Sequence, residues 1–207
     1  NSKSDILFFL DDDAIIDSLA PIEYVREYFE KNLMVGILAF KILNYYSRTI
    51  QTHEFPSLNK WRSPDSPFNT STFIGAGHAI RRSLFDSCGL YPEEYFYGME
   101  ELDFSCRVID KGYEIVYDPN ITILHKASLK GRVRNDEKWI MMYRNRLLIS
   151  YQFFPLFYHL VSAVICFIKT MYTSKSMVVP VKGFFRFIKL KEYYSRDHII
   201  SKPAIHY

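Results

Sequence analysis

The stretch FFLDDDAIID, residues 8–17, passes directly from an apolar run to three adjacent carboxylates. The apolar run Ile6–Leu10 has the length and character of a buried strand. Adjacent carboxylates repel one another, and aspartate is a poor former of strands and helices. The cluster therefore predicts that a positive group belongs beside it. The alternative is an aspartate-rich turn in which Asp13 or Asp17 caps the following helix.

Asp11 and Asp13 are the candidate metal ligands within this cluster. If the chain stays extended there, their side chains point to one side and that of Asp12 to the other. In α/β sheets, ligands bind outside the carboxyl ends of the strands, where these residues would lie. Carboxylate oxygens suit Mg²⁺ or Mn²⁺, and such an ion usually keeps some waters and binds substrate phosphates.

Periodicity and turn residues indicate an α/β fold with a mixed, mostly parallel sheet flanked by helices. Residues 51–72 contain three prolines and are expected to form a long loop. The glycines of FIGAGHAI, residues 73–80, indicate a strand whose backbone another group must approach. Further strands are expected at Ile6–Leu10, Met34–Leu43, Tyr113–Tyr117 and Ile121–Leu124, and helices from Pro21 and over Arg82–Cys88, Glu100–Lys111 and Trp139–Ile149.

Two further places carry side chains suited to chemistry. Glu100, Glu101 and Asp103 crowd the start of a predicted helix, after aromatic residues and a glycine. The helix dipole alone would favour negative charge there, but partial burial would also make a carboxylate a better base. His125 ends the run ITILH and follows a strand, as the aspartates do. A lone histidine is usually structural, so its position at a strand end is what favours a ligand role.

Charge is distributed unevenly along the 207 residues, whose net charge is +3. Up to His125 there are 19 acidic and 11 basic residues, and after it 15 basic and 4 acidic ones. An acidic first part suits a metal site, and a basic second part suits an anionic partner such as a diphosphate or lipid headgroups. Because the basic residues of the tail alternate with apolar runs, lipid is favoured over nucleic acid.

The tail has two segments that could contact a membrane. Residues 147–168 lack Asp, Glu, Lys and Arg. This uncharged segment is long enough to cross a bilayer, although Pro155 weakens this interpretation. Met177–Leu190 mixes apolar residues with Lys and Arg, as does a helix lying in a membrane surface. A helical bundle packed on the main domain is the alternative. We expect a catalytic domain over residues 1–150 and a helical tail over 151–207.

The cysteines and the first residue of the chain give two further expectations. Cys88, Cys106 and Cys166 have no metal-ligand spacing and are expected to be reduced and buried in a cytoplasmic protein. The chain begins at Asn1, without Met, just before a strand. We therefore expect that it lacks an N-terminal part.

The order of these pieces resembles a known family. FLDDD is followed by FIGAGHAIRRSLFDSCGLYPEEYFYGMEELDFSCRVIDKGYEIVYDPNITILH. This order is similar to that of family 2 inverting glycosyltransferases of the GT-A fold, which include bacterial rhamnosyl- and galactosyltransferases. The resemblance covers residues 4–150, and the block 75–125 is more specific than the aspartate cluster. Members of the family begin with strand–helix units that hold the nucleotide base and ribose, and these would precede Asn1.

The resemblance implies roles for individual residues. Asp11 and Asp13, the second more directly, would bind Mn²⁺ or Mg²⁺ together with His125, and the ion would bridge the diphosphate of a nucleotide sugar. The donor-binding residues would be Asp11, Asp12, Gly75, Ala76, Gly77, Glu100 and Arg144. An Arg-Asn pair in a later helix of the family is matched by Arg144–Asn145, and Arg144 could contact phosphate.

The family also implies the catalytic base. Its acidic pair at a helix start is usually Glu-Asp, and the second member removes the acceptor proton. Here the pair is Glu100–Glu101, which points to Glu101. Because a glutamate reaches one methylene further than an aspartate, Glu100 and Asp103 remain open as alternatives. A basic loop with Lys130, Arg132 and Arg134 would close over the diphosphate, or would simply be solvated.

These features predict a metal-dependent glycosyltransferase at the cytoplasmic face of the cell membrane. It would move a sugar, with inversion, from a nucleoside diphosphate to a saccharide or lipid-linked saccharide in cell-surface polysaccharide synthesis. The alternative is a degenerate remnant that only binds a membrane or a protein. A phosphatase with Asp11 as nucleophile fits less well, because the acidic pair opens a helix and the block 75–125 would be unexplained.

Overall fold

The computed structural model of the protein describes residues 4–57, 59, 61–126, 135–196 and 200. These residues fall into two compact units. The first contains the chain up to Leu90 and again from Phe104 to Lys126, and the second contains Tyr91–Asp103 and the described residues from 135 onward. The predicted boundary at residue 150 lies inside a continuous helix, α4 (Asn135–Phe153).

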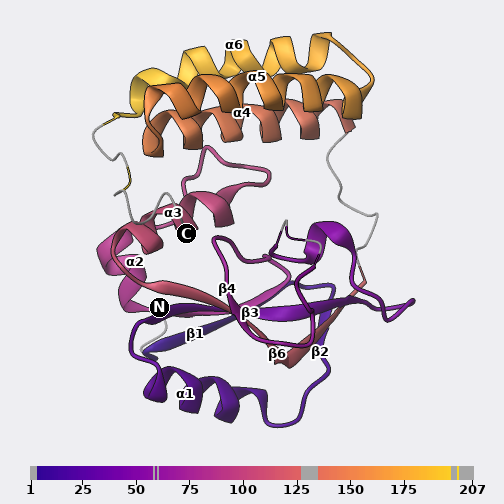
Figure 1. The fold of residues 1–207 in the computed structure, drawn as a ribbon, viewed down its shortest axis with the longest axis vertical. Coiled ribbons are helices and arrows are strands. Elements are labelled where there is room, and N and C mark those ends of the chain that lie inside the picture. Colours follow the sequence, from indigo (N-terminus) through magenta and orange to yellow (C-terminus); the bar gives the residue numbers. More distant parts are fainter. Residues whose placement is uncertain (1–3, 58, 60, 127–134, 197–199, 201–207) are drawn as a thin grey trace. The chain divides into compact units, whose positions relative to one another are not determined.

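A mixed sheet forms the core of the first unit (Figure 1). Its strands follow the order β1 (Ile6–Leu10), β5 (Gly77–Arg81), β3 (Val35–Asn44), β6 (Glu114–His125) and β2 (Ala14–Ile16), with β4 (Phe68–Asn69) beside β6. Among the described strands, β3 and β6 are parallel and the other pairings are antiparallel.

The expectation of a mostly parallel sheet is therefore wrong. Two successive parallel strands need a crossover that returns the chain to the end where the first strand began. The connection between β3 and β5, residues 45–76, does not return the chain to the end where β3 began, so β5 runs antiparallel to β3. The predicted long loop, which contains the short helix η1 (Thr52–Glu54) and β4, thus determines the strand direction.

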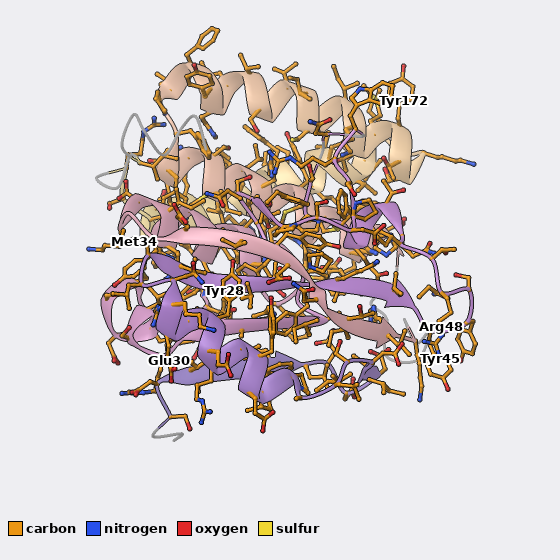
Figure 2. The ribbon with its side chains drawn as sticks, turned by 60° about the horizontal axis from the view of Figure 1, so that its bottom comes forward. Tyr28, Glu30, Met34, Tyr45, Arg48 and Tyr172 are labelled. Atoms are coloured by element: carbon orange, nitrogen blue, oxygen red, sulfur yellow. The ribbon has the colours of Figure 1, made fainter. Side chains whose placement is uncertain are left out.

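Strand β3 is the centre of the core because Val35–Phe40 are buried without interruption. Helix α1 (Pro21–Lys31) covers one face of the sheet and buries Val25 and Phe29 there. Figure 2, in which Tyr28 is labelled, shows this helix lying across the strands. Burial of a phenylalanine side chain such as Phe29 contributes about 1.5–3 kcal/mol, so this helix is held by packing.

Arg81 closes the end of α1. Its guanidinium Nη2 donates to the carbonyl oxygens of Phe29 and Asn32 at 2.7 and 2.9 Å, and Nε donates to that of Val35 at 2.7 Å. These bonds satisfy carbonyl groups that a helix leaves unpaired at its C-terminus. The first of the paired arginines, Arg81–Arg82, therefore has a structural role. Helix α2 (Ser83–Cys88) follows directly.

Strand β6 combines the two strands predicted at Tyr113–Tyr117 and Ile121–Leu124. Its register against β3 jumps from Asp118 to Thr122 between successive residues of β3. The residues between them bulge out of the ladder, beginning at Pro119, which has no N–H to donate. This bulge explains why the sequence pattern breaks there although the strand continues.

The second unit is a set of helices: α4, α5 (Leu156–Ser174) and α6 (Val178–Leu190), followed by η2 (Lys191–Tyr193). The uncharged run 147–168 does not form one helix, as a membrane span would require. Helix α4 ends at Phe153 and α5 begins after Pro155, because a proline has no N–H to continue the helix.

The cysteines are free, as predicted. Cys106 is buried, whereas Cys88 and Cys166 are half-buried. The expectation of burial is therefore correct for Cys106 and wrong for the other two.

Candidate metal and donor site

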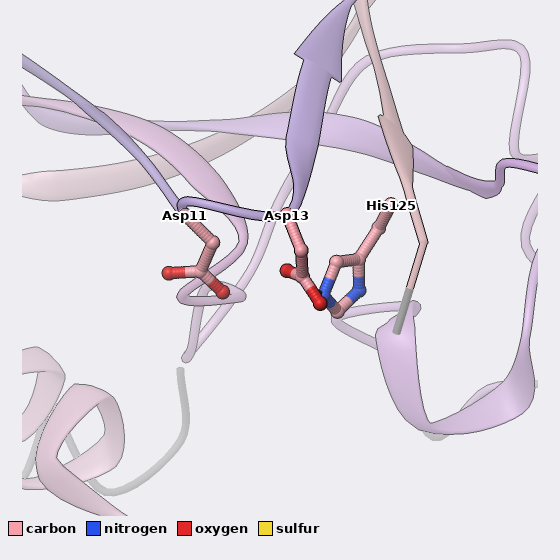
Figure 3. Close-up of side chains that lie close together, drawn as sticks. All are labelled: Asp11, Asp13 and His125. Atoms are coloured by element: carbon pink, nitrogen blue, oxygen red, sulfur yellow. The ribbon is translucent and has the colours of Figure 1, made fainter. Parts of the chain in front are cut away.

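The three aspartates form the connection between β1 and β2, which lie at opposite ends of the strand order. The chain is not extended there, because the Ala14 N–H donates to the Asp11 carbonyl at 3.1 Å and closes a turn. Asp11 and Asp13 nevertheless both lie close to His125 (Figure 3). The connection is thus an aspartate-rich turn that also brings two carboxylates together.

The capping role considered for this turn is not observed. Helix α1 begins after Ala20, and within the described chain no side chain caps it by a hydrogen bond. Asp17 instead lies 2.7 Å from the guanidinium of Arg48, in an exposed ion pair. Neither Asp13 nor Asp17 is therefore explained as a helix cap.

His125 is the last residue of β6, and its backbone is held from both sides. Its register partners are Ala14 of β2 and Asn44 of β3. Its carbonyl accepts a hydrogen bond from the Tyr45 N–H at 2.9 Å, and the N–H of the next residue, Lys126, donates to the carbonyl of Asp13 at 3.0 Å. This pairing fixes the histidine directly against the aspartate turn.

Asp11, Asp13 and His125 each offer a ligand atom, and these atoms lie within 4.8 Å of one another. Nε2 of His125 is 3.0 Å from Oδ1 of Asp13. Two carboxylates and one imidazole at these separations fit a divalent cation. The three residues predicted as ligands therefore lie together, whereas metal binding itself stays a prediction.

Electrostatics at this cluster favour a cation. Partial burial raises the pKa of Asp11 above its ordinary value; His125 opposes this shift and the charges of Asp13 and Asp12 add to it. The pKa of His125 is raised by its hydrogen bond to Glu54, and the nearby charges of Asp13 and Asp11 add to this, while burial opposes it. The shift of His125, and the contributions of Asp13 and Asp12 to the shift of Asp11, reflect an excess of negative charge around one imidazole.

Glu54 is a residue of this cluster that the sequence analysis missed. It ends η1, is 4% exposed, and places Oε1 2.5 Å from Nδ1 of His125. In the sequence it lies within a predicted loop, 71 residues before the histidine. The apolar Phe55 and Pro56 directly after it were a weak signal that this part of the loop is buried.

Gly75, Ala76 and Gly77 lie next to the aspartate turn, where β5 begins. The carbonyl of Ala76 accepts a hydrogen bond from the Asp11 N–H at 3.3 Å. The group that approaches Gly77 is Ile123 of β6: a Cβ at position 77 would lie 2.6 Å from its Cγ1. Packing within the protein thus requires a glycine there, and contact of residues 75–77 with a donor sugar stays a prediction.

Glu100 and Glu101 begin α3 (Glu100–Asp110) and are half-buried, whereas Asp103 is buried. Asp103 is therefore the least accessible of the three as a base. Residues 100–103 belong to the second unit and the aspartate turn to the first. A position of Glu101 opposite the metal ligands stays a prediction.

The turn before α3 has an unusual backbone. Gly98 and Met99 both have positive φ, at 72° and 78°. A non-glycine residue in this region is uncommon and persists only where its surroundings hold it. Asn145 of α4 does so: its Nδ2 donates to the carbonyl oxygens of Gly98 at 2.8 Å and Tyr97 at 3.3 Å.

Arg144 belongs to the same arrangement. It is buried, and its Nη2 donates to the carbonyl of Glu94 at 2.5 Å and to Oδ1 of Asn145 at 2.7 Å. The Arg-Asn pair therefore holds the segment that leads to Glu100 and Glu101, and a contact between Arg144 and phosphate stays a prediction. The basic loop with Lys130, Arg132 and Arg134 lies outside the described residues.

Comparisons of sequence give a match to part of the chain. No family model matches it. An uncharacterized protein of Haemophilus influenzae is 41% identical over 92 residues, which are 44% of this chain and 50% of that protein. The chain therefore spans about half the length of the curated relative that it matches.

Comparisons of structure identify the fold. A structure of GalNAc-T7 with UDP, GalNAc and Mn²⁺ matches 92% of this chain and 41% of its own, with a TM-score of 0.51 and 15% identity. Mannosyltransferase PcManGT from Pyrobaculum calidifontis, in complex with GDP-Man and Mn²⁺, matches 98% of this chain and 53% of its own, with a TM-score of 0.46 and 13% identity. On the basis of the match to GalNAc-T7, the chain has a glycosyltransferase fold, with a mixed sheet and flanking helices.

Proposed function

We propose that this chain carries the metal and diphosphate site of an inverting glycosyltransferase, as in family 2. The observation that carries the proposal is the convergence of Asp11, Asp13 and His125 within 4.8 Å in a chain with a glycosyltransferase fold. The presence of UDP, GalNAc and Mn²⁺ in the GalNAc-T7 structure supports a nucleoside-diphosphate sugar as donor and Mn²⁺ or Mg²⁺ as the ion.

The reaction is a single displacement at the anomeric carbon. A divalent cation held by the cluster would supply positive charge to the departing diphosphate. The acceptor oxygen attacks from the opposite face, the bond to the diphosphate breaks, and Glu101 takes the hydroxyl proton. The half-buried position of Glu101 after a turn that Asn145 fixes supports this role, because a base must be held in place to act.

Calorimetric titration with UDP and with GDP tests the metal site. Binding is expected to need Mn²⁺ and to weaken strongly in His125→Ala, because the imidazole ligand is lost. The matched control is His53→Ala, which removes an exposed histidine from η1. Equal binding with and without Mn²⁺ would refute the metal assignment and favour a non-catalytic remnant.

The base is tested by release of nucleoside diphosphate from a panel of nucleotide sugars and saccharide acceptors. Glu101→Gln should bind nucleotide as the unmodified protein does but turn over about 10²–10⁴-fold more slowly, because it cannot accept the proton. Normal turnover in Glu101→Gln together with loss in Glu100→Gln would assign the base to Glu100.

We further propose that α5 and α6 of the second unit bind a membrane, at its cytoplasmic face. Within the described residues, α5 is long and apolar enough to cross a bilayer, and 11% of its apolar window is buried. Tyr172 on this helix projects outward (Figure 2). Further large apolar side chains are exposed at Leu156, Phe157, Tyr158, Leu160, Val161, Val164, Ile165 and Ile168 of α5 and at Val178, Val181, Phe184 and Phe185 of α6.

The polar groups near this surface favour lipid as its partner. Lys182 and Lys189 of α6 are exposed and could meet anionic headgroups while the apolar residues enter the bilayer. An apolar groove of about 350 Å³ lies between the helices and would suit a lipid chain, such as that of a lipid-linked acceptor. Its lining residues are Tyr143, Ala163, Val164, Phe167, Ile168, Val181 and Phe184.

Flotation with vesicles tests the membrane proposal. We expect binding to vesicles that contain phosphatidylglycerol, weaker binding to neutral vesicles, and loss of binding in Ile165→Glu. The control is Leu19→Glu, at a leucine of the first unit that is 97% exposed. Binding that Ile165→Glu leaves unchanged would rule out this surface.

A further inference from the structure

His125 lies between two carboxylates on opposite sides of its ring. Nε2 is 3.0 Å from Oδ1 of Asp13, and Nδ1 is 2.5 Å from Oε1 of Glu54. A neutral imidazole carries one proton, so the nitrogen that donates a hydrogen bond leaves the other one free to bind a metal. If Nδ1 donates its proton to Glu54, Nε2 therefore carries the lone pair and faces Asp13 with it.

Glu54 differs from the other carboxylates of the cluster in its burial. The exposed fraction of its side chain is 4%, compared with 24% for Asp13 and 17% for His125. Its Oε2 has no hydrogen-bond partner among the residues that the structure describes. A buried carboxylate that lacks partners is costly, so the imidazole N–H is the main compensation for placing Glu54 there.

The segment that carries Glu54 is anchored to the strand that carries His125. The ring of Phe55 packs edge-on against Tyr117 of β6 and Phe68 of β4, with centroids 5.5 and 5.6 Å apart. The hydroxyl of Thr70 donates to the carbonyl of Pro56 at 2.5 Å. Packing on β6 thus sets the position of Glu54 relative to His125, although a loop carries it.

We propose that Glu54 is a positioning residue for the metal site. It accepts the hydrogen bond from Nδ1–H of His125, which fixes the tautomer and the ring orientation that present Nε2 to the space beside Asp11 and Asp13. Partners of this kind, behind a ligating histidine, typically change metal affinity about 10- to 100-fold when removed. The inference deepens the proposed function and rests on its metal site.

Binding of Mn²⁺, measured from the electron paramagnetic resonance signal of the free ion with and without UDP, tests the inference. Glu54→Leu, which keeps much of the volume but cannot accept a hydrogen bond, should bind Mn²⁺ about 10- to 100-fold more weakly. In a His125→Ala background the same change should have no further effect, because the ring that Glu54 orients is absent. A purely structural role would lower affinity in both backgrounds.

A second variant covers the case in which Glu54→Leu does not fold. In Glu54→Gln the amide can accept or donate, so it no longer enforces one tautomer. Long-range ¹H–¹⁵N spectra of the metal-free protein, recorded where His125 is neutral, should show the proton on Nδ1 with Glu54 and a larger share on Nε2 with glutamine. An unchanged tautomer, or Mn²⁺ affinity within twofold of the unmodified protein in both variants, would overturn the inference. If the unmodified protein does not bind Mn²⁺, both the proposed metal site and this inference are overturned.

Discussion

Acidification from about pH 7 to about pH 4 should weaken the protein through His78 of β5. This side chain is 4% exposed, its ring stacks on Phe9 with centroids 4.8 Å apart, and Phe73 lies at 4.5 Å. Burial lowers the pKa of His78 from 6.5 to about 4, and hydrogen bonds to the backbone of Ile74 and Gly75 oppose the shift only in part. The folded protein therefore keeps His78 neutral.

The size and sign of the effect follow from these two pKa values. Between about pH 6.5 and 4 the unfolded chain binds a proton at His78 that the folded protein excludes. The free energy of unfolding should therefore fall as the pH drops through this window and level off below it. The full difference corresponds to about 3 kcal/mol, at about 1.4 kcal/mol for each pH unit. Well above pH 6.5 His78 is neutral in both states and adds no pH dependence.

Urea unfolding across this pH range measures the effect. In His78→Phe, which keeps an aromatic ring against Phe9, the decrease should be smaller by about 3 kcal/mol. The comparison with His78→Phe is needed because His125 changes the free energy of unfolding in the opposite direction. Its pKa is raised in the folded protein, so its stabilisation is present at low pH and is lost as the pH rises. Parallel pH profiles for the two proteins, or a pKa of His78 near 6.5 by nuclear magnetic resonance, would refute the reasoning.

Three further substitutions test close contacts. Gly77→Ala should destabilise the protein by about 1–3 kcal/mol in urea unfolding, because its Cβ would lie 2.6 Å from Cγ1 of Ile123; a cost that persists in an Ile123→Ala background would point to another cause. Gly183→Ala should cost a similar amount, since its Cβ would meet Cδ1 of Tyr143 at 2.8 Å, whereas a gain in stability would show that α4 and α6 separate easily. Asn145→Ala should cost about 1–2 kcal/mol and speed amide exchange in the turn before α3, and unchanged exchange would contradict its role there.

The positions of several elements could be predicted from local pattern. Strand β1 coincides with the predicted Ile6–Leu10, α1 begins at the predicted Pro21, and α3 ends one residue before the predicted Lys111. The local signals are the apolar run that forms β1, the proline that begins α1, and Gly112, two residues after the end of α3. The direction of β5 was not predictable, because it depends on the path of residues 45–76 rather than on any pattern within the strand.

The candidate site likewise contains residues that the sequence could identify and one that it could not. Asp11, Asp13 and His125 were identifiable because carboxylates and a histidine at strand ends are residue types suited to a metal, and their positions along the chain show this. Glu54 was not identifiable, since its contact with His125 joins residues 71 positions apart and depends on how Phe55 packs on β6. Hydrogen bonds and periodicity within an element act between near neighbours and can be read from the chain. A hydrogen bond such as that between His125 and Glu54, or a close contact such as that of Gly77 with Ile123, forms only where the folded path brings distant residues together.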